Sequence, residues 1–289
     1  FGATRLGLAS RSIDERLIMA SVWSYEGMRV VVTGGGGSGM GAAAVSELVD
    51  LGAEVHVIDL KDAPVQVASQ QAVDLRDPDA SAAAIEKIGG PINALFNCAG
   101  LPGPPFSDLD TMLVNFVAMR HLAELCADRM PTGGAIASIS STAGSGYLQS
   151  IEKWMPLVTT PDFASAKAWC EANPEAIASG YAPSKEAIIV WTMYAAKALA
   201  ERNIRVNCIS PGPTDTPMMP AFEDFAGKAM IDMFTAGMGR RSTPIEQAYP
   251  LIFLNSKAAS YITGENFITD GGTLGSMMTG TVVLSFDGS

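Results

Sequence analysis

The stretch Tyr181-Ala-Pro-Ser-Lys185 holds a residue pair suited to proton transfer. A tyrosine and a lysine four positions apart on a helix lie on the same face, one turn from each other. If that face borders a cleft, the ammonium group favours the ionised phenol, and the tyrosine can exchange protons near neutral pH. The same spacing is common on amphipathic helices, where a half-buried tyrosine lies beside a solvated lysine. The pair therefore needs other elements to build a site around it.

The first such elements lie near the N-terminus. Arg29–Thr33 is a β-branched run that predicts a buried strand, residues 34–41 are rich in glycine, and residues 42–51 form an alanine-rich helical stretch closed by Gly52. Strand, glycine loop and helix are typical of a dinucleotide-binding unit, because glycines let the backbone approach a pyrophosphate at the helix N-terminus. A flexible glycine linker is the alternative, which the flanking strand and helix disfavour.

Asp59 ends the next predicted strand, residues 54–59. It stands about 20 residues beyond the glycines, where a carboxylate accepts hydrogen bonds from the ribose hydroxyls of the adenosine. A negative charge there would also repel a 2′-phosphate, which favours NAD over NADP. The alternative is an ordinary loop aspartate.

The remaining chain alternates between strand and helix patterns. Further strands are predicted at 71–75, 92–97, 134–141, 204–210 and 267–270, and helices at 78–88, 113–122, 181–201 and 245–254. This alternation predicts an α/β fold, a single doubly wound parallel sheet of the Rossmann type with helices on both faces. The helix that follows Tyr181 is apolar almost all round, so we expect both of its faces to be buried.

Two segments depart from this alternation, and one polar residue lies within an apolar helix. Residues 142–180 are too long for a simple connection, so we expect an insert with helices of its own. Residues 214–241 are rich in methionine, which predicts a mobile lid over an apolar substrate or, alternatively, an ordinary packed helix pair. Asn115 lies inside an apolar helix, where an amide needs a partner and has either a structural or a functional role.

Composition excludes several classes of function. The formal net charge of −11 argues against nucleic acid or an anionic membrane surface as the main partner. Hydrophobic residues make up 48% of the chain. No segment reaches 18 consecutive apolar residues, so the sequence predicts no membrane span. Four scattered cysteines indicate core positions in a reducing compartment, so we expect a cytoplasmic protein. The two histidines lie far apart, and we predict no metal site.

We divide the chain into three parts. Residues 1–27 are interpreted as an N-terminal extension that we expect to be poorly ordered, residues 28–278 as the catalytic domain, and residues 279–289 as a C-terminal tail.

Taken in order, the motifs are the glycine loop, Asp59, Asp74, N-C-A-G at 97–100, Asn115, S-S-T-A-G at 140–144, Y-A-P-S-K, P-G-P-T-D-T-P at 211–217 and D-G-G at 270–272. Over roughly residues 28–278 this series resembles the short-chain dehydrogenase/reductase family. Within the family the chain is similar to the branch of 3α-hydroxysteroid dehydrogenase/carbonyl reductases and coniferyl-alcohol dehydrogenases. The features that carry this finer resemblance are the long insert, L-V-N-F at 113–116, M-G-R-R at 238–241 and A-A-S-Y at 258–261.

The resemblance implies roles for individual residues. Tyr181 would be the general acid/base, Lys185 would lower its pKa and bind the nicotinamide ribose, Ser141 would hydrogen-bond the substrate oxygen, and Asn115 would hold a water that links the lysine to solvent. The implied cofactor-binding residues are Gly35, Ser38, Gly39, Met40, Gly41, Asp59, Leu60, Asp74, Leu75, Asn97, Ala99, Gly100, Tyr181, Lys185, Pro211, Gly212, Thr214 and Thr216. The family loop T-G-x-x-x-G-x-G fits if one glycine is inserted, which makes Gly35, Gly39 and Gly41 the fingerprint glycines.

These observations lead to one main hypothesis and two alternatives. The main hypothesis is an NAD-dependent alcohol dehydrogenase/carbonyl reductase for a bulky apolar substrate, such as a hydroxysteroid or an aryl allylic alcohol. By resemblance we expect a homodimer or homotetramer. One alternative is a non-catalytic NAD(H)-binding redox sensor, which the presence of serine, tyrosine and lysine disfavours. The other is a ketoreductase for acyl substrates on an acidic carrier protein, which the acidity of the chain disfavours.

Overall fold

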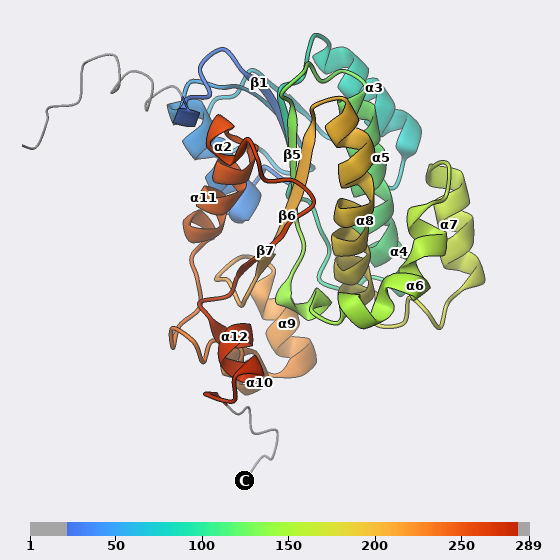
Figure 1. Cartoon of the computed structure of the whole chain (residues 1–289), viewed down its shortest axis with the longest axis vertical. Helices are drawn as coiled ribbons and strands as arrows, with labels where there is room; N and C mark the ends of the chain where they lie inside the picture. Colours follow the sequence, from blue (N-terminus) through green and yellow to red (C-terminus); the bar gives the residue numbers. More distant parts are fainter. Residues whose placement is uncertain (1–21, 283–289) are drawn as a thin grey trace, which may run out of the picture.

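The computed structural model describes residues 22–282 and shows one parallel sheet (Figure 1). Its strand order is β3-β2-β1-β4-β5-β6-β7, and every neighbouring pair is parallel. The strands are β1 (Arg29–Thr33), β2 (Glu54–Ile58), β3 (Ser69–Gln71), β4 (Ala94–Asn97), β5 (Ala135–Ile139), β6 (Arg205–Pro211) and β7 (Asn266–Thr269). The predicted doubly wound Rossmann-type sheet is confirmed.

Helices cover both faces of the sheet (Figure 1). One face carries α2 (Met40–Asp50) and α11 (Pro244–Asn255), and the other carries α3 (Pro78–Ile88), α5 (Met119–Ala127) and α8 (Tyr181–Glu201). Successive side chains of a strand point to opposite faces, so Val31 joins the core cluster under α5 and α8, whereas Val30 and Val32 join the cluster under α2 and α11. This is why the strands read as continuous apolar runs.

The carboxyl ends of the central strands form the edge at which a ligand can bind. Strand β1 pairs with β2 on one side and with β4 on the other, so the chain reverses its direction of winding at β1. In open α/β sheets the crevice at such a reversal binds ligands. Thr33 and Asn97 lie side by side in register at this edge.

The insert has helices of its own, as expected, and they are α6 (Tyr147–Val158) and α7 (Phe163–Ala172). It packs against α8, where Trp154 of α6 is fully buried and donates from Nε1 to the Glu186 carboxylate of α8 at 2.7 Å. Arg120 of α5, 1% exposed, holds the turn between α6 and α7. Its guanidinium donates to the carbonyls of Leu157, Val158 and Asp162 and to the Thr160 hydroxyl.

The expected N-terminal boundary is wrong for residues 22–27. The Tyr25 side chain is fully buried and its hydroxyl donates to the Ile252 carbonyl at 2.6 Å, because burying a tyrosine is favourable when its hydroxyl has a partner. Trp23 packs on Phe253 with 5.8 Å between ring centroids. Residues 1–21 and 283–289 lie outside the described residues.

Two further expectations need correction. The strand predicted at 71–75 is Ser69–Gln71, which leaves Asp74 and Leu75 in the following loop. The prediction that α8 is buried all round holds near its N-terminus but fails further on, where Met193 and Tyr194 are exposed.

Within residues 22–282, every helix is too short or too polar to cross a membrane.

Candidate active site

The tyrosine and lysine lie on the first turns of α8, at the carboxyl edge of the sheet. Tyr181 is the first residue of the helix. Lys185 is 4% exposed, its Nζ donates to the Ile139 carbonyl at the end of β5 at 2.9 Å, and the same atom lies 5.3 Å from the centroid of the Tyr181 ring. Strand β5 therefore holds the lysine beneath the tyrosine.

Burial shifts the pKa values of both members of this pair. Burial raises the pKa of Tyr181 to about 12, and the Ser141 hydroxyl opposes this shift. Burial also lowers the pKa of Lys185 to about 8. In the protein chain alone, loss of water is the largest influence on the phenol, and the Lys185 ammonium is directed at the Ile139 carbonyl. That the lysine favours the ionised phenol stays a prediction.

The two serines at the end of β5 have different environments. Ser140 is 1% exposed and its hydroxyl donates to the Lys185 carbonyl at 2.8 Å, so it holds β5 to α8. The Ser141 oxygen accepts a hydrogen bond from the Ala143 amide at 3.1 Å, which leaves the hydroxyl proton able to bond a ligand. Ser141 is therefore the serine suited to contact a substrate oxygen.

Asn115 lies in a π-helical turn, η1 (Leu113–Ala118), that interrupts the helix between α4 (Asp108–Met112) and α5. Its side chain accepts from the Leu101 amide at 2.6 Å and donates to the Leu101 carbonyl and the Ser184 hydroxyl, both at 3.0 Å. The amide is thus fully engaged with the protein, as the structural alternative expects. The water-holding role stays a prediction.

The glycine loop has the geometry of a phosphate site. Gly34 has φ +68°, and a Cβ there would lie 2.4 Å from the Ala99 amide nitrogen. A Cβ on Gly41 would lie 2.2 Å from the Gly34 carbonyl oxygen, so helix α2 packs closely on the loop. Gly34 is therefore the glycine that lies closest to the backbone that follows β4. The cofactor contact of Gly35 stays a prediction.

The start of α2 can receive an anion. Its N-cap is Gly39, for which no described side chain supplies a capping hydrogen bond and no described atom lies within 4 Å of an added Cβ. The first amide groups of a helix need acceptors, and the helix dipole favours a negative charge there. The loop therefore fits the pyrophosphate of a dinucleotide.

The two predicted carboxylates lie at the expected edge but differ in their partners. Asp59 accepts from the amides of Gly36 and Lys61, both at 2.8 Å, which fixes its carboxylate at the end of β2. Asp74 is paired with Arg76 at 2.6 Å, and this hydrogen-bonded pair lowers the pKa of Asp74. Arg76 also pairs with Asp110 at 2.8 Å. An adenine bound at Asp74 would accordingly contact a carboxylate that is already paired with Arg76.

Some of the remaining predicted residues lie along the edge of the sheet, and the others line one cavity. Asn97 is buried and donates to the Ser138 hydroxyl at 3.3 Å, while Leu75 is buried and Leu60 is 71% exposed. Ser38 is exposed in the glycine loop, and Ala99 and Gly100 follow β4. The residues that the structure brings together around one cavity are Met40, Ser141, Tyr181, Pro211, Gly212, Thr214 and Thr216.

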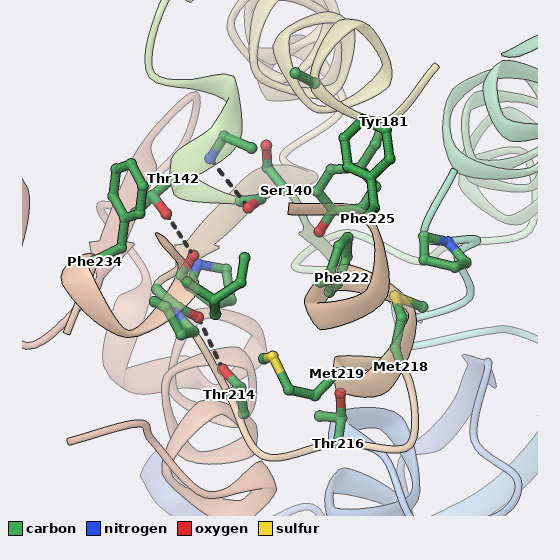
Figure 2. Close-up of a pocket in the computed structure, with 18 of the residues that line it drawn as sticks. Ser140, Thr142, Tyr181, Thr214, Thr216, Met218, Met219, Phe222, Phe225 and Phe234 are labelled. Carbon is green, nitrogen blue, oxygen red and sulfur yellow. Dashed lines mark hydrogen bonds between the residues drawn. The ribbon is translucent and has the colours of Figure 1, made fainter. Parts of the chain in front are cut away.

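This cavity has a volume of about 300 Å³ and is mostly apolar. Its outer wall comes from α9 (Met219–Ala226), α10 (Lys228–Met233) and the turns beside them. Figure 2 shows Phe222 and Phe225 beside Tyr181, with Met218 and Met219 further along the same wall. The Phe222 ring meets the Tyr181 ring edge-on at 4.8 Å. Residues 214–241 therefore form one wall of the cavity, as expected of a lid. Their mobility stays a prediction.

Sequence reasoning missed several residues that shape the site. Phe222, Phe225 and Phe234 line the cavity beside the predicted methionines. Arg120 hydrogen-bonds to Thr160 of the insert, and Arg241 forms an ion pair with Glu223 of the lid. An arginine within the apolar stretch 113–122 was a usable signal for Arg120, since a charged residue in a buried helix requires partners.

Comparisons with known proteins agree with this geometry. The family model described as short chain dehydrogenase matches residues 29–152, and the one described as enoyl-(acyl carrier protein) reductase matches residues 163–273. A coniferyl-alcohol dehydrogenase of Pseudomonas sp. strain HR199 is 30% identical over 245 residues, covering 84% of this chain and 95% of the relative. A 3-alpha-hydroxysteroid dehydrogenase/carbonyl reductase of Comamonas testosteroni is 32% identical over 250 residues, covering 85% and 96%.

Solved structures show the same fold. The 3-alpha-hydroxysteroid dehydrogenase of Pseudomonas sp. B-0831 complexed with NADH has a TM-score of 0.73 and 26% identity, and the match covers 88% of this chain and all of the other. A short chain dehydrogenase from Burkholderia cenocepacia J2315 in complex with NADP has a TM-score of 0.67 and 26% identity, with 86% and 99% covered.

Proposed function

Because the chain belongs to the short-chain dehydrogenase/reductase family, whose members are oxidoreductases of alcohols and carbonyls, we propose that it interconverts a bulky apolar alcohol and its carbonyl compound with NAD. The alcohol is secondary or allylic. The observation that carries the proposal is the apolar cavity of about 300 Å³ that opens onto Tyr181 and Ser141.

The chain's own residues supply the proton chemistry. A bound nicotinamide supplies or accepts the hydride. Tyr181 gives a proton to the substrate oxygen in reduction, which suits a phenol whose pKa is raised to about 12 and which is therefore protonated near neutral pH. In oxidation the phenol must lose that proton, and the ammonium of Lys185 favours the loss. Ser141 donates a hydrogen bond to the substrate oxygen, and this bond strengthens as negative charge develops there.

The cavity favours a substrate with a large apolar body. Its outer wall is built from phenylalanine and methionine side chains, which pack on flat or irregular apolar surfaces. The names of two relatives, coniferyl-alcohol dehydrogenase and 3-alpha-hydroxysteroid dehydrogenase/carbonyl reductase, support the same class. We therefore propose an aryl allylic alcohol or a hydroxysteroid as the substrate.

A direct assay tests this proposal. The protein is mixed with NAD or NADP and with coniferyl alcohol or a 3α-hydroxysteroid, and the absorbance of the reduced cofactor is followed. Reduction of NAD with either alcohol supports the proposal and selects the substrate class. Tight NADH binding without turnover of these or related alcohols supports the redox-sensor alternative. Turnover restricted to carrier-linked acyl substrates supports a ketoreductase.

The choice of NAD rests on Asp59, and its replacement by serine is expected to shift the preference toward NADP. The carboxylate is held by two backbone amides at the end of β2, so it cannot easily turn away from a 2′-phosphate. Removing one close like-charge interaction is expected to raise the NADP/NAD ratio of kcat/KM by about tenfold or more, since 1.4 kcal/mol corresponds to a factor of ten.

The measurement is kcat/KM for both cofactors with one alcohol. Asp62→Ser is the matched control, because this exposed aspartate lies close in sequence and contacts the side chain of Gln70. An unchanged ratio in Asp59→Ser, or a native enzyme that already prefers NADP, would contradict the assignment.

Two broader properties belong to the same proposal. All four cysteines, Cys98, Cys126, Cys170 and Cys208, carry free thiols, which supports a reducing environment such as the cytoplasm. We also propose a homodimer or homotetramer, which light scattering on the purified protein would test.

A further inference from the structure

The second arginine of the M-G-R-R motif lies beneath the two lid helices. The Arg241 side chain is 14% exposed and faces carboxylates from three segments. Its Nη2 lies 2.6 Å from Glu223 in α9, its Nε lies 2.8 Å from Asp232 in α10, and its Nη1 lies 3.6 Å from Asp215 in the turn after β6.

An arginine is well suited to such a junction. The planar guanidinium presents five N–H donors in a fixed arrangement, so it can bind several carboxylates at once, whereas the ammonium of lysine is a single compact charge. The backbone of Arg241 is also well placed, because the next residue, Ser242, forms a β-bridge with Thr214. The side chain therefore connects both lid helices to a part of the chain that is anchored to the sheet.

A neighbouring face of the same helices forms the wall of the cavity. Phe222 precedes Glu223 in α9, and Ile231 precedes Asp232 in α10, and both apolar side chains line the cavity. Phe222 is also the residue whose ring contacts Tyr181. The position of the apolar wall relative to the catalytic tyrosine thus depends on where Arg241 holds the two carboxylates.

We propose that Arg241 is a positioning residue that sets the apolar wall of the lid and thereby selects bulky substrates over small ones. The part that concerns substrates rests on the proposed function, whereas the part that concerns the lid does not.

The charges around Arg241 indicate how strongly its loss acts. An isolated exposed ion pair contributes little, but Arg241 is mostly buried and joins three pairs. Among residues 22–282, the ion pairs of Asp215, Glu223 and Asp232 involve Arg241 and, for Asp232 alone, Lys228. Without the arginine, three carboxylates face one ammonium. The resulting repulsion would separate α9 from α10.

The test uses Arg241→Gln, with Arg240→Gln as the matched control. Arg240 is adjacent and its guanidinium pairs with Glu246 of α11. The first measurement is hydrogen exchange of lid peptides without substrate. We expect exchange of residues 219–234 to become at least about tenfold faster in Arg241→Gln, with the sheet strands unchanged, and to stay native in Arg240→Gln. Arg241→Lys is expected to fall between Arg241→Gln and the native protein.

The second measurement compares a bulky alcohol with a small secondary alcohol. In Arg241→Gln we expect KM for the bulky alcohol to rise about tenfold with little change in kcat, and kinetics with the small alcohol to stay native, because uniform binding is lost rather than proton transfer. Native exchange in the lid, or equal losses with both alcohols, would overturn the proposal.

The two measurements separate this inference from the proposed function. If the native protein oxidises none of the alcohols, the exchange experiment still tests whether Arg241 holds the lid. If Arg241→Gln does not fold, Glu223→Gln takes its place, because it removes the bond between Arg241 and α9 and is expected to give smaller changes in the same direction.

Discussion

Replacing Tyr181 by phenylalanine is expected to lower kcat by roughly 10²- to 10⁴-fold, the usual contribution of a positioned general acid or base. The ring is retained, so its edge-on contact with Phe222 at 4.8 Å and its place above Lys185 are preserved. The substitution removes the hydroxyl that transfers the proton. Binding of NADH should therefore stay within about twofold of the native value, since it does not depend on that proton.

Two measurements check this expectation, steady-state turnover followed by NADH absorbance and NADH affinity followed by fluorescence. Tyr194→Phe is the matched control, because Tyr194 lies on the same helix and is 51% exposed. Full activity in Tyr181→Phe would remove the tyrosine from the mechanism. A parallel loss of NADH binding would indicate that the hydroxyl is needed to bind the cofactor.

Replacing Arg120 by methionine is expected to lower the free energy of unfolding by roughly 3 kcal/mol, because the turn between α6 and α7 loses several hydrogen bonds from a buried guanidinium, and a hydrogen bond to a charged group contributes about 1.5–3 kcal/mol. Methionine fills similar apolar volume but donates no hydrogen bond. The groups affected belong to the end of α6 and the start of α7: the carbonyls of Leu157, Val158 and Asp162. The insert should loosen first, since Arg120 connects its turn to α5.

Urea denaturation measures this change as a shift of the midpoint at constant slope. Arg129→Met is the control, because this exposed arginine lies near the same helix and a surface substitution usually changes stability by less than about 0.5 kcal/mol. A loss below about 1 kcal/mol in Arg120→Met would mean that apolar packing of Trp154 and Leu157 alone holds the insert.

Much of the fold was predictable because its signals are local. Short β-branched strands alternate with helices of several turns, and each strand carries its polar or small residues at its carboxyl end, as Asp59, Asn97 and Ser141 do. Parallel strands bring such ends to one edge of a sheet. The order of the motifs then sufficed to place Ser141, Tyr181 and Lys185 in a common site.

Other features depend on contacts between segments that are distant in the chain, and no local pattern specifies them. Tyr25 enters the core because its hydroxyl reaches the carbonyl of Ile252. Burial beneath the lid, rather than the spacing to Lys185, sets the direction of the Tyr181 pKa shift. Arg120 and Arg241 have partners on other helices. Burial and hydrogen-bond partners are properties of the packed molecule, so the strengths of these interactions follow from the three-dimensional arrangement.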